Sequence, residues 1–489
     1  MIFNSTEFIL FLPLVTISYY ITQYRYRWIV LLIASYFFYM TWSPKYTIFI
    51  IITTISTYLS ALLMDRCNLK KHKKKYLILN LAINLGLLVF FKYLNFISSS
   101  FNSLFKTLKL SYKLPILNLI LPIGISFYTF KALGYTIDVY RGDIKAEKHF
   151  GILALFLSFF PQVLSGPIDR ASNLLPQFHE KHRLEYSNIK HGLILILWGF
   201  FKKIVIADNL AVFVNQIFNS PQNYTGMPLL LAAVFFGIQI YCDFSGYSDT
   251  AIGVGKMLGF KFIDNFNRPY GSKSIPEFWR RWHISLSSWF RDYVYIPLGG
   301  NRVSAKRWSF NQLVVFLLSG LWHGANWTFV IWGVLHGIYA IASKLTMNIR
   351  KAFTDRIGLK KYPKVHSVIR IFITFVLVDF AWIFFRANSI SDALYIISNL
   401  FTGIEFSLTS MAVLLASLGI GKFNFIVVLL CTAFLFIVEY YQGDNPIEDI
   451  VDQKPILLRW TFYYALLFVI ILLGGYGYEE STQFIYSQF

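Results

Sequence analysis

Long apolar runs separated by short polar or basic loops dominate the chain. Runs of about 18 or more apolar residues are typical of transmembrane helices. We expect about ten to twelve membrane crossings, together with partial or re-entrant pieces. The clearest predicted spans are 27–42, 46–64, 76–97, 229–241, 368–385, 423–440 and 457–475.

The basic residues indicate how the chain is oriented. Cytoplasmic loops carry an excess of Lys and Arg, and the loop 65–75 (DRCNLKKHKKK) contains six of them. Counting the helices back from this loop places 23–27 (QYRYR) on the same side and the N-terminus outside. The first residues, MIFNSTEFILFLP, lack a basic stretch and contain Glu7. They therefore favour a retained first helix over a cleaved signal peptide.

Several segments interrupt the apolar pattern. In 98–115 (SSSFNSLFKTLKLSYKLP) apolar residues recur three and four apart among lysines, which suits an interfacial helix or an ordinary loop. The segments 121–142 and 159–170 mix Pro, Gly and polar residues into apolar runs. Irregular backbone is tolerated at membrane depth only when it is buried in protein or lines water. In 235–260 we expect a helix that ends in an acidic, glycine-rich turn, followed by a second helix.

Composition narrows the class of protein. Of the 489 residues 56% are hydrophobic and only 14% are charged, which predicts one all-α polytopic membrane domain rather than two soluble domains. The net charge of +20 lies in short loops, which indicates topology and contact with membrane lipid, and no nucleic acid. The cysteines Cys67, Cys242 and Cys431 are scattered and predict neither a disulfide framework nor a metal site.

Two histidines stand out in a chain that has 9. His283 lies in SIPEFWRRWHISLSSWFRDYVYIPLGGNR and His323, forty residues later, in SGLWHGANWTFVIWGVLHG. Ionisable residues inside a membrane are costly and are functional candidates by default. Burial disfavours the charged imidazolium, so we expect a neutral His323 that can act as a general base. His336, on the opposite face of the same predicted helix, is expected to be structural.

Local signals place these histidines on helices. Ser274 and Glu277 form a capping box, which predicts a helix start. On that helix His283 would share a face with residues including Trp279, and the helix would re-enter or lie at the cytoplasmic mouth of a cavity. A plain interfacial helix is the alternative. His323, between two glycines, would share a face with Trp327, Val330 and Val334.

Further polar residues are candidates for binding or orienting reactants. Lys202 and Lys203 lie where an apolar helix meets an interface, so they could snorkel or attract an anionic cofactor. Asp243 and Asp249 could orient a catalytic base or satisfy backbone donors at a turn. The remaining cofactor-binding candidates are Arg280, Arg281 and Trp282, and the remaining orienting or tunnel-lining candidates are Ser245, Trp279, Trp322 and Asn326.

The central motifs carry a family resemblance. EFWRRWHISLSSWFRDYVYIPLGGNR followed by LWHGANW resembles the membrane-bound O-acyltransferase family, specifically its bacterial alginate and peptidoglycan O-acetyltransferase branch. The D-alanyl transferase of teichoic acid modification is a related member. SGPIDR, FKKIVIADNLA, YCDFSGYSD and FNRPY extend the resemblance over nearly the whole chain. It implies a ring of transmembrane helices around a central tunnel, with short or re-entrant helices. It also implies that His323 is the catalytic histidine and His283 the second, supporting one.

The resemblance implies an activity and its partners. Cytoplasmic acetyl-CoA would supply the acyl group, and an extracytoplasmic SGNH-esterase-like acetyltransferase would complete the transfer. We therefore expect a plasma (inner) membrane enzyme that passes acetyl outward for O-acetylation of a cell-envelope polysaccharide. Peptidoglycan is the predicted acceptor; alginate-type acetylation and teichoic-acid-type D-alanylation are alternatives. His323 would deprotonate the acceptor hydroxyl, while His283 would position the donor or polarise its thioester. A proton-coupled transporter or flippase, with the histidines as relay groups, is the rival from another class.

The end of the chain carries one more resemblance. Residues 1–475 are expected to form the transmembrane domain, with a catalytic core at 121–345, and residues 476–489 an extracytoplasmic tail. The last six residues, FIYSQF, resemble the FxYxxF terminus of the small single-helix partner in the D-alanylation system. This implies that Tyr486 relays the acyl group. The alternative is an aromatic anchor at the interface, where Tyr is enriched.

Overall fold

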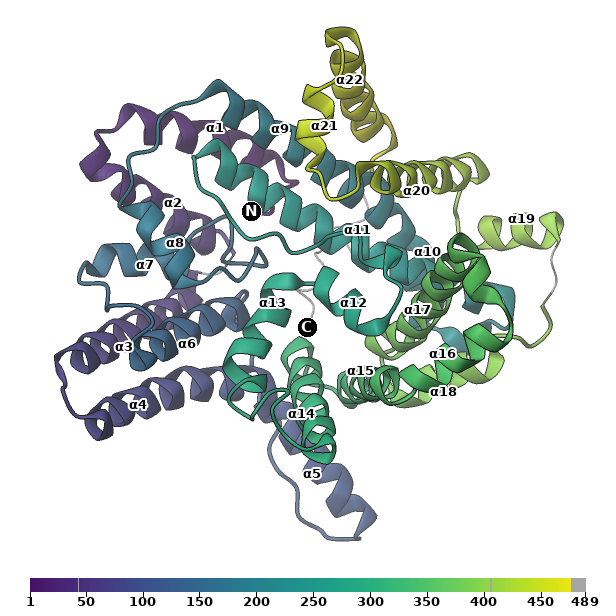
Figure 1. The fold of residues 1–489 in the computed structure, drawn as a ribbon, viewed down its shortest axis with the longest axis horizontal. Coiled ribbons are helices and arrows are strands. Elements are labelled where there is room, and N and C mark those ends of the chain that lie inside the picture. The colour runs from purple at the N-terminus through teal and green to yellow at the C-terminus, as the bar shows by residue number, and fades with distance from the viewer. Residues whose placement is uncertain (43, 405–406, 476–489) are drawn as a thin grey trace. The chain divides into compact units, whose positions relative to one another are not determined.

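The computed structural model describes residues 1–42, 44–404 and 407–475, and within these ranges every regular element is a helix. Among these described residues, seven helical segments are long and apolar enough to cross a membrane by length and composition. They are Pro44–Arg66, Lys70–Thr107, Met227–Met257, Trp327–Leu345, Pro363–Arg386, Lys422–Gln442 and Ile456–Leu473. The predicted fold class, an all-α polytopic membrane protein, is confirmed (Figure 1).

The predicted spans agree with these segments in all but two places. The predicted span 27–42 is a shorter helix, α2 (Arg27–Met40), which is not among the seven. The segment Trp327–Leu345 qualifies as a span, although its apolar run was not among the clearest in the sequence. The first apolar stretch forms α1 (Thr6–Ile21), which is also shorter than a typical span. Ser5 caps it by accepting a hydrogen bond from the backbone N–H of Phe8.

The chain divides into two compact units. The first contains Met1–Leu193 and Ala251–Ile263, and the second contains Ile194–Thr250 and Asp264–Phe489. The helices of the first unit, besides α1 and α2, are α3 (Thr47–Arg66), α4 (Lys70–Leu88), α5 (Leu94–Thr107), α6 (Ile125–Arg141), α7 (Phe150–Ser158) and α8 (Ala171–Phe178). A π-helical turn, Val89–Tyr93, joins α4 to α5.

Helices α3, α4 and α6 pack against one another in the first unit (Figure 1). Polar side chains link them. The side-chain amide of Asn80 donates to the hydroxyl of Thr136 at 2.6 Å, and the hydroxyl of Thr57 donates to the side-chain oxygen of Asn80 at 3.5 Å. Hydrogen bonds between helices are a usual means of association in a membrane, where lipid is as apolar as the side chains. These contacts specify how the three helices meet.

Two sequence predictions for the first unit had opposite outcomes. The segment 159–170 is non-helical and almost entirely buried between α7 and α8, as irregular backbone at membrane depth requires. The prediction for 121–142 was wrong over most of its length, because α6 is a regular helix. The irregular part lies before it and ends at Gly124, whose φ of 75° lets the chain turn into the helix.

The segment 98–115 is partly helical and partly irregular, and its predicted position in the membrane interface stays a prediction. Its first part belongs to α5, and the rest is an irregular segment that returns along this helix. Asn102 donates to the carbonyl oxygen of Leu114 and accepts from its N–H, and Asn95 does the same for Leu117. The two asparagines therefore satisfy backbone groups that a plain loop would leave to solvent.

The second unit contains the two histidine motifs. Its complete helices are α10 (Asp208–Asn219), α12 (Ile275–Arg281), α13 (Ile284–Phe290), α14 (Ala305–His323), α15 (Trp327–Leu345), α16 (Met347–Arg356), α17 (Pro363–Arg386), α18 (Ile390–Asn399), α19 (Leu408–Ser417), α20 (Lys422–Gln442), α21 (Ile447–Asp452) and α22 (Ile456–Leu473). The helix α9 (Tyr186–Phe200) is followed by a π-helical stretch, Phe201–Ala207.

The acidic, glycine-rich turn predicted within 235–260 is absent. A single helix, α11 (Met227–Met257), runs through this segment without a break. The glycines of this segment serve close packing instead. A Cβ at Gly246 would lie 2.6 Å from the carbonyl oxygen of Gly199, and one at Gly237 would lie 2.5 Å from a carboxylate oxygen of Asp379. The prediction was wrong because a glycine that admits a neighbouring backbone or side chain looks, in sequence, like a glycine that ends a helix.

Helices α14 and α15 form a tight hairpin. Only residues 324–326 separate them, and Gly320 and Gly333 face each other where the helices meet. A Cβ at Gly320 would lie 2.3 Å from the carbonyl oxygen of Phe329. Small residues allow such close approach of helix backbones in membranes. The hairpin places His323, the last residue of α14, beside α15.

Candidate active site

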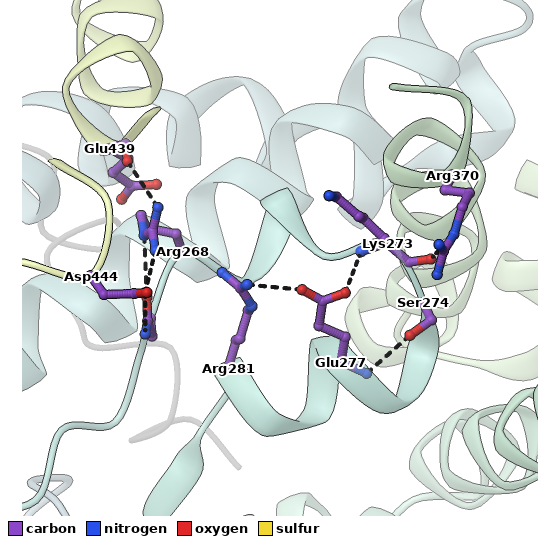
Figure 2. A network of polar contacts seen from close by, with 9 residues as sticks. Arg268, Lys273, Ser274, Glu277, Arg281, Arg370, Glu439 and Asp444 are labelled. Carbon is purple, nitrogen blue, oxygen red and sulfur yellow. Dashed lines mark hydrogen bonds and ion pairs between the residues drawn. The ribbon is translucent and has the colours of Figure 1, made fainter. Parts of the chain in front are cut away.

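The helix α12 begins where the sequence predicts it. The hydroxyl of Ser274 accepts a hydrogen bond from the N–H of Glu277 at 3.3 Å, and the Glu277 carboxylate accepts from the N–H of Lys273 at 2.9 Å (Figure 2). Glu277 also forms an ion pair with Arg281, four residues later, at 2.8 Å. The Ser274 contact satisfies a donor at the start of the helix, so the predicted helix start is confirmed. The Glu277 carboxylate bonds to the N–H of Lys273 rather than to that of the N-cap Ser274.

This helix ends before it reaches His283. The chain leaves the helical conformation at Trp282, and His283 adopts a left-handed conformation with φ 43° and ψ 54° before α13 begins. The predicted continuous helix, with His283 on one face together with Trp279, Leu286, Ser287 and Phe290, is therefore wrong. A left-handed conformation costs roughly 1–2 kcal/mol for a residue with a Cβ. Nothing in the local pattern indicates such a break.

Asn265 holds the break in place. Its backbone carbonyl oxygen accepts from the N–H of Ile284 at 2.9 Å. Its side-chain oxygen accepts from the hydroxyl of Ser285 at 2.6 Å and lies 3.3 Å from Nδ1 of His283. Asn265, His283 and Ser285 are all fully buried. Asn265 was not among the residues predicted from the sequence, where its only signal is its position directly before the FNRPY block.

The fold brings the two motif histidines together. The rings of His283 and His323 lie 6.5 Å apart between centroids, and the indole of Trp322 lies 5.8 Å from His283 and 5.0 Å from His323. Both histidines are buried. The ring of Phe244, from α11, packs edge-on against His283 at 4.7 Å. The two histidines singled out by the family resemblance thus lie close together, in an aromatic setting.

Burial has a direct electrostatic consequence for His283. Desolvation lowers its pKa to about 3, because the imidazolium loses its hydration shell. The ring is therefore neutral near pH 7. A neutral imidazole has one nitrogen that donates and one that accepts a proton, as proton transfer requires.

His336 also lies near this cluster, contrary to the expectation from a single helix. The hairpin interrupts the helix between His323 and His336, so the predicted opposite faces do not apply. Trp332 lies between them, 5.0 Å from the ring of His323 and 4.9 Å from that of His336. Trp279 donates through Nε1 to Nδ1 of His336 at 3.3 Å. His336 therefore ties α12 to α15, consistent with its predicted structural role. The predicted face shared by His323 with Trp327, Val330 and Val334 is wrong for the same reason.

The candidate lysines of the π-helical stretch are buried and paired. Lys202 forms an ion pair with Asp249 at 2.8 Å. Lys203 forms one with Asp208 at 2.8 Å and another with Asp243. Removing one partner of such a buried pair typically costs about 3–5 kcal/mol, because it leaves an uncompensated charge. The predicted binding of an anionic cofactor by these lysines stays a prediction, and the pairing does not favour it. Asp243 and Asp249 each form an ion pair with one of these lysines, and their predicted role in orienting a catalytic base stays a prediction.

An exposed basic cluster lies on and beside α12. Lys273 and Arg280 are exposed, and Arg370 donates to the backbone carbonyl oxygen of Lys273 at 3.1 Å (Figure 2). Arg268 forms an ion pair with Asp444. A hydrogen bond from Asn267 and the charge of Arg268 hold the pKa of Asp444 below its usual value, so it stays ionised.

The other candidates fall into distinct settings. Trp282 is fully buried and stacks on Phe278 at 5.4 Å, so its predicted contact with a cofactor is not favoured. Ser245 is buried on α11. Asn326 caps α15 by accepting from the N–H of Thr328, and it also donates to the carbonyl oxygen of Asn388. Tyr486 and the predicted tail, 476–489, lie outside the described residues.

Comparison with known proteins decides the family. The model of the membrane-bound O-acyltransferase family matches residues 148–385, which include both motif histidines. The probable alginate O-acetylase of Pseudomonas putida is 36% identical over 501 residues, covering all of both chains. This chain belongs to the membrane-bound O-acyltransferase family. It is therefore a multi-pass membrane acyltransferase, and the resemblance read from its motifs is confirmed.

Two further relatives show the range of the family branch. The peptidoglycan O-acetyltransferase of Helicobacter pylori is 37% identical over 434 residues, covering 82% of this chain and 80% of the relative. The teichoic acid D-alanyltransferase of Streptococcus thermophilus is 31% identical over 281 residues, covering 54% of this chain and 68% of the relative. These matches agree with the branch predicted from the sequence.

Proposed function

We propose that this acyltransferase takes acetyl from cytoplasmic acetyl-CoA and passes it outward across the plasma membrane for O-acetylation of a cell-envelope polysaccharide. The observation that carries the proposal is the buried pair formed by His283 and His323, 6.5 Å apart between ring centroids. The names of two similar proteins, a probable alginate O-acetylase and a peptidoglycan O-acetyltransferase, support acetyl as the group and a polysaccharide as the acceptor.

The histidine pair supplies the proton acceptor that acyl transfer needs. An acceptor hydroxyl loses its proton, its oxygen bonds to the thioester carbonyl carbon, and the carbon–sulfur bond breaks; the released CoA thiolate takes up the proton. General base catalysis of this kind contributes typically about 10²–10⁴-fold. The motif match gives the base to His323 and a supporting role to His283.

The exposed basic cluster suits the anionic donor. Arg280, on the helix that leads to His283, and Lys273, just before that helix, present charge to solvent, and CoA carries several phosphates. These two residues and Arg281 would hold the phosphates near the cytoplasmic face. Arg281 is partly neutralised by Glu277, so Arg280 and Lys273 would contribute more to binding.

The proposed route beyond the histidines involves the C-terminal tail and a separate protein. Tyr486 would receive acetyl and an extracytoplasmic SGNH-esterase-like acetyltransferase would deliver it to the polysaccharide. Peptidoglycan is the predicted acceptor, and alginate is the alternative that the similar proteins support equally well.

The deciding experiment follows acetyl-labelled acetyl-CoA with the purified protein in detergent. We expect release of free CoA and a covalent label on Tyr486, both lost in His323→Ala by about 10²–10⁴-fold. The matched control is His72→Ala, because His72 is exposed in the first turn of α4. Release without label on Tyr486 would keep the enzyme and exclude the relay, as would full activity after deletion of the last six residues. Absence of CoA release from the unsubstituted enzyme, even with candidate partners added, would overturn acetyl-CoA as the donor.

The acceptor is tested in the same system with the partner added. Peptidoglycan fragments and alginate oligosaccharides are offered separately, and acetyl esters are measured on each. We expect ester on peptidoglycan. Ester on alginate alone would overturn the predicted acceptor and leave the transferase assignment intact.

A further inference from the structure

The position of Asn265 bears on which nitrogen of His283 carries the proton. The Asn265 side-chain oxygen lies between two buried groups, the hydroxyl of Ser285 at 2.6 Å and Nδ1 of His283 at 3.3 Å. An amide oxygen only accepts hydrogen bonds. The nitrogen that faces it must therefore be the one bearing hydrogen, which makes His283 an Nδ1–H tautomer. Its Nε2 then carries the lone pair.

The backbone reinforces this arrangement. His283 has a left-handed conformation, φ 43°, and the next N–H, of Ile284, donates to the carbonyl oxygen of Asn265. Strained conformations of this kind persist only where the surroundings over-determine them, and they cluster at functional sites. Asn265 thus fixes both the backbone turn at His283 and the nitrogen of its ring that is hydrogen-bonded.

We propose that Asn265 is a positioning residue that holds His283 as the Nδ1–H tautomer, so that Nε2 acts as a proton acceptor during acyl transfer. The inference rests on the proposed function and changes the part given to His283. A nitrogen without hydrogen cannot polarise a thioester by donating to its carbonyl. It can instead receive, by way of His323, the proton of the acceptor hydroxyl: the O–H bond breaks, Nε2–H forms, the oxygen bonds to the carbonyl carbon, and the departing thiolate recovers the proton.

The logic resembles that of other histidine bases. A carboxylate or carbonyl oxygen on one ring nitrogen sets the tautomer and orientation, and the opposite nitrogen reacts. Loss of such a partner typically costs about 10–100-fold in activity. A neutral amide at this position orients the ring without adding charge to a buried site, where an unpaired carboxylate would be costly.

The activity test compares three variants of the full-length enzyme by CoA release between pH 5 and 9. Asn265→Leu keeps the size of the side chain but removes the acceptor, and we expect about a 10–100-fold loss. Asn265→Asp keeps an acceptor and adds negative charge, which favours protonated His283. We expect it to retain most of the activity, with the acid limb of the pH profile shifted to higher pH. Ser285→Ala removes the other hydrogen bond to the same oxygen, and we expect an unchanged pH profile.

Two results would overturn the proposal. One is activity of Asn265→Leu equal to that of the unsubstituted enzyme. The other is a loss in Asn265→Asp as deep as in Asn265→Leu, because that would mean the amide donates to Nδ1 instead of accepting from it. Thermal unfolding of each variant separates a loss of function from a loss of fold.

A second measurement does not depend on activity. Nitrogen-15 NMR of histidine-labelled protein in lipid, with His283 assigned by difference from His283→Gln, reports which ring nitrogen carries hydrogen. We expect Nδ1–H, and a changed tautomer balance in Asn265→Leu. Hydrogen on Nε2 would refute the positioning role. If the tautomer is found as expected but no CoA is released, the proposed function fails and the assignment of Asn265 stands.

Discussion

His283 occupies a position where a charged ring is costly and its backbone is strained. The residue is fully buried, and its left-handed conformation costs roughly 1–2 kcal/mol. The hydrogen bond between the His283 ring and Asn265 offsets part of this cost. So does the hydrogen bond that the backbone carbonyl oxygen of His283 accepts from the N–H of Ser287. Because both penalties are confined to one residue next to His323, they point to a site selected for chemistry rather than for stability.

The depressed pKa of His283 predicts how stability depends on pH. Unfolded histidine has a pKa of about 6.5, and in the folded state burial lowers it to about 3. Between these values the unfolded chain binds the proton more tightly, so the free energy of unfolding falls as pH decreases. One such group contributes at most about 1.4 kcal/mol per pH unit. We expect full stability above about pH 6.5 and a progressive loss below it.

Thermal unfolding in detergent at a series of pH values from 8 to 5 measures this dependence. His283→Gln removes the titrating ring, so its unfolding temperature should fall less steeply on acidification than that of the unsubstituted protein. His72→Gln is the control, since His72 is exposed. Identical slopes in all three proteins would show that His283 does not titrate in the way its burial indicates.

At the scale of elements, the hairpin of α14 and α15 positions His323. The closest approach of the two helices lies at Gly320, one turn before His323, where an added Cβ would meet the carbonyl oxygen of Phe329 at 2.3 Å. Backbone atoms cannot move aside as a flexible side chain can. The orientation of His323 therefore depends on a residue that has no functional group.

Gly320→Ala should separate the two helices of this hairpin. We expect a destabilisation of about 1–3 kcal/mol, typical of overpacking, and reduced CoA release because His323 is displaced. The matched control is Gly86→Ala on α4, where an added Cβ meets nothing within 4 Å. That substitution should be neutral or stabilise by up to about 1 kcal/mol. Unfolding temperature and CoA release are measured for both; equal behaviour of the two variants would contradict the close approach.

A second element, α16, has the pattern of a helix that lies in the membrane interface. It connects the spans Trp327–Leu345 and Pro363–Arg386, so it lies at one membrane surface. Ile349, Phe353 and Ile357 recur every four residues and are all exposed, while Arg350 and Arg356 flank this stripe. An apolar stripe bordered by arginines suits acyl chains below and phosphate headgroups beside it.

The immersion of α16 can be measured with an environment-sensitive fluorophore. In a background without native cysteines, Phe353→Cys carries the label on the apolar stripe and Asn348→Cys carries it on the opposite face. After reconstitution in anionic lipid, we expect blue-shifted, lipid-quenched emission for the label at 353 and aqueous emission for the label at 348. Aqueous emission at both positions would show that the helix stands clear of the membrane.

At the scale of the whole molecule, the distribution of charge predicts the orientation in the membrane. The loop 65–75 is expected in the cytoplasm and the N-terminus outside, by the positive-inside rule. Cys67 lies in this loop and is half-buried, whereas Cys242 is fully buried in the protein. A native thiol therefore reports on the side of the membrane.

A membrane-impermeant maleimide should label Cys67 in inverted vesicles but not in intact cells. For comparison, Thr6→Cys in a Cys67→Ser background places an exposed thiol near the N-terminus. It should react in intact cells. The reverse pattern would overturn the predicted orientation of this segment and of the N-terminus.

The sequence by itself was sufficient for the class of fold, most of the spans and the family. Lipid offers no hydrogen bonds, so a spanning segment forms a helix that satisfies its own backbone and carries apolar side chains. Long apolar runs in the sequence therefore predict the spans. The start of α12 was equally predictable, because Ser274 and Glu277 cap it through contacts three residues apart. Features that depend only on neighbouring residues, such as apolar runs and helix caps, can be predicted from the sequence.

The tertiary structure alone decided the details of the site. The break at His283 depends on Asn265, eighteen residues away, and the burial of Lys203 is compensated by Asp243, forty residues away. The glycines of α11 and α14 admit neighbouring atoms rather than ending helices. Such choices depend on which distant groups meet at membrane depth, where every buried charge and polar atom needs a partner, and no window of neighbouring residues contains that information.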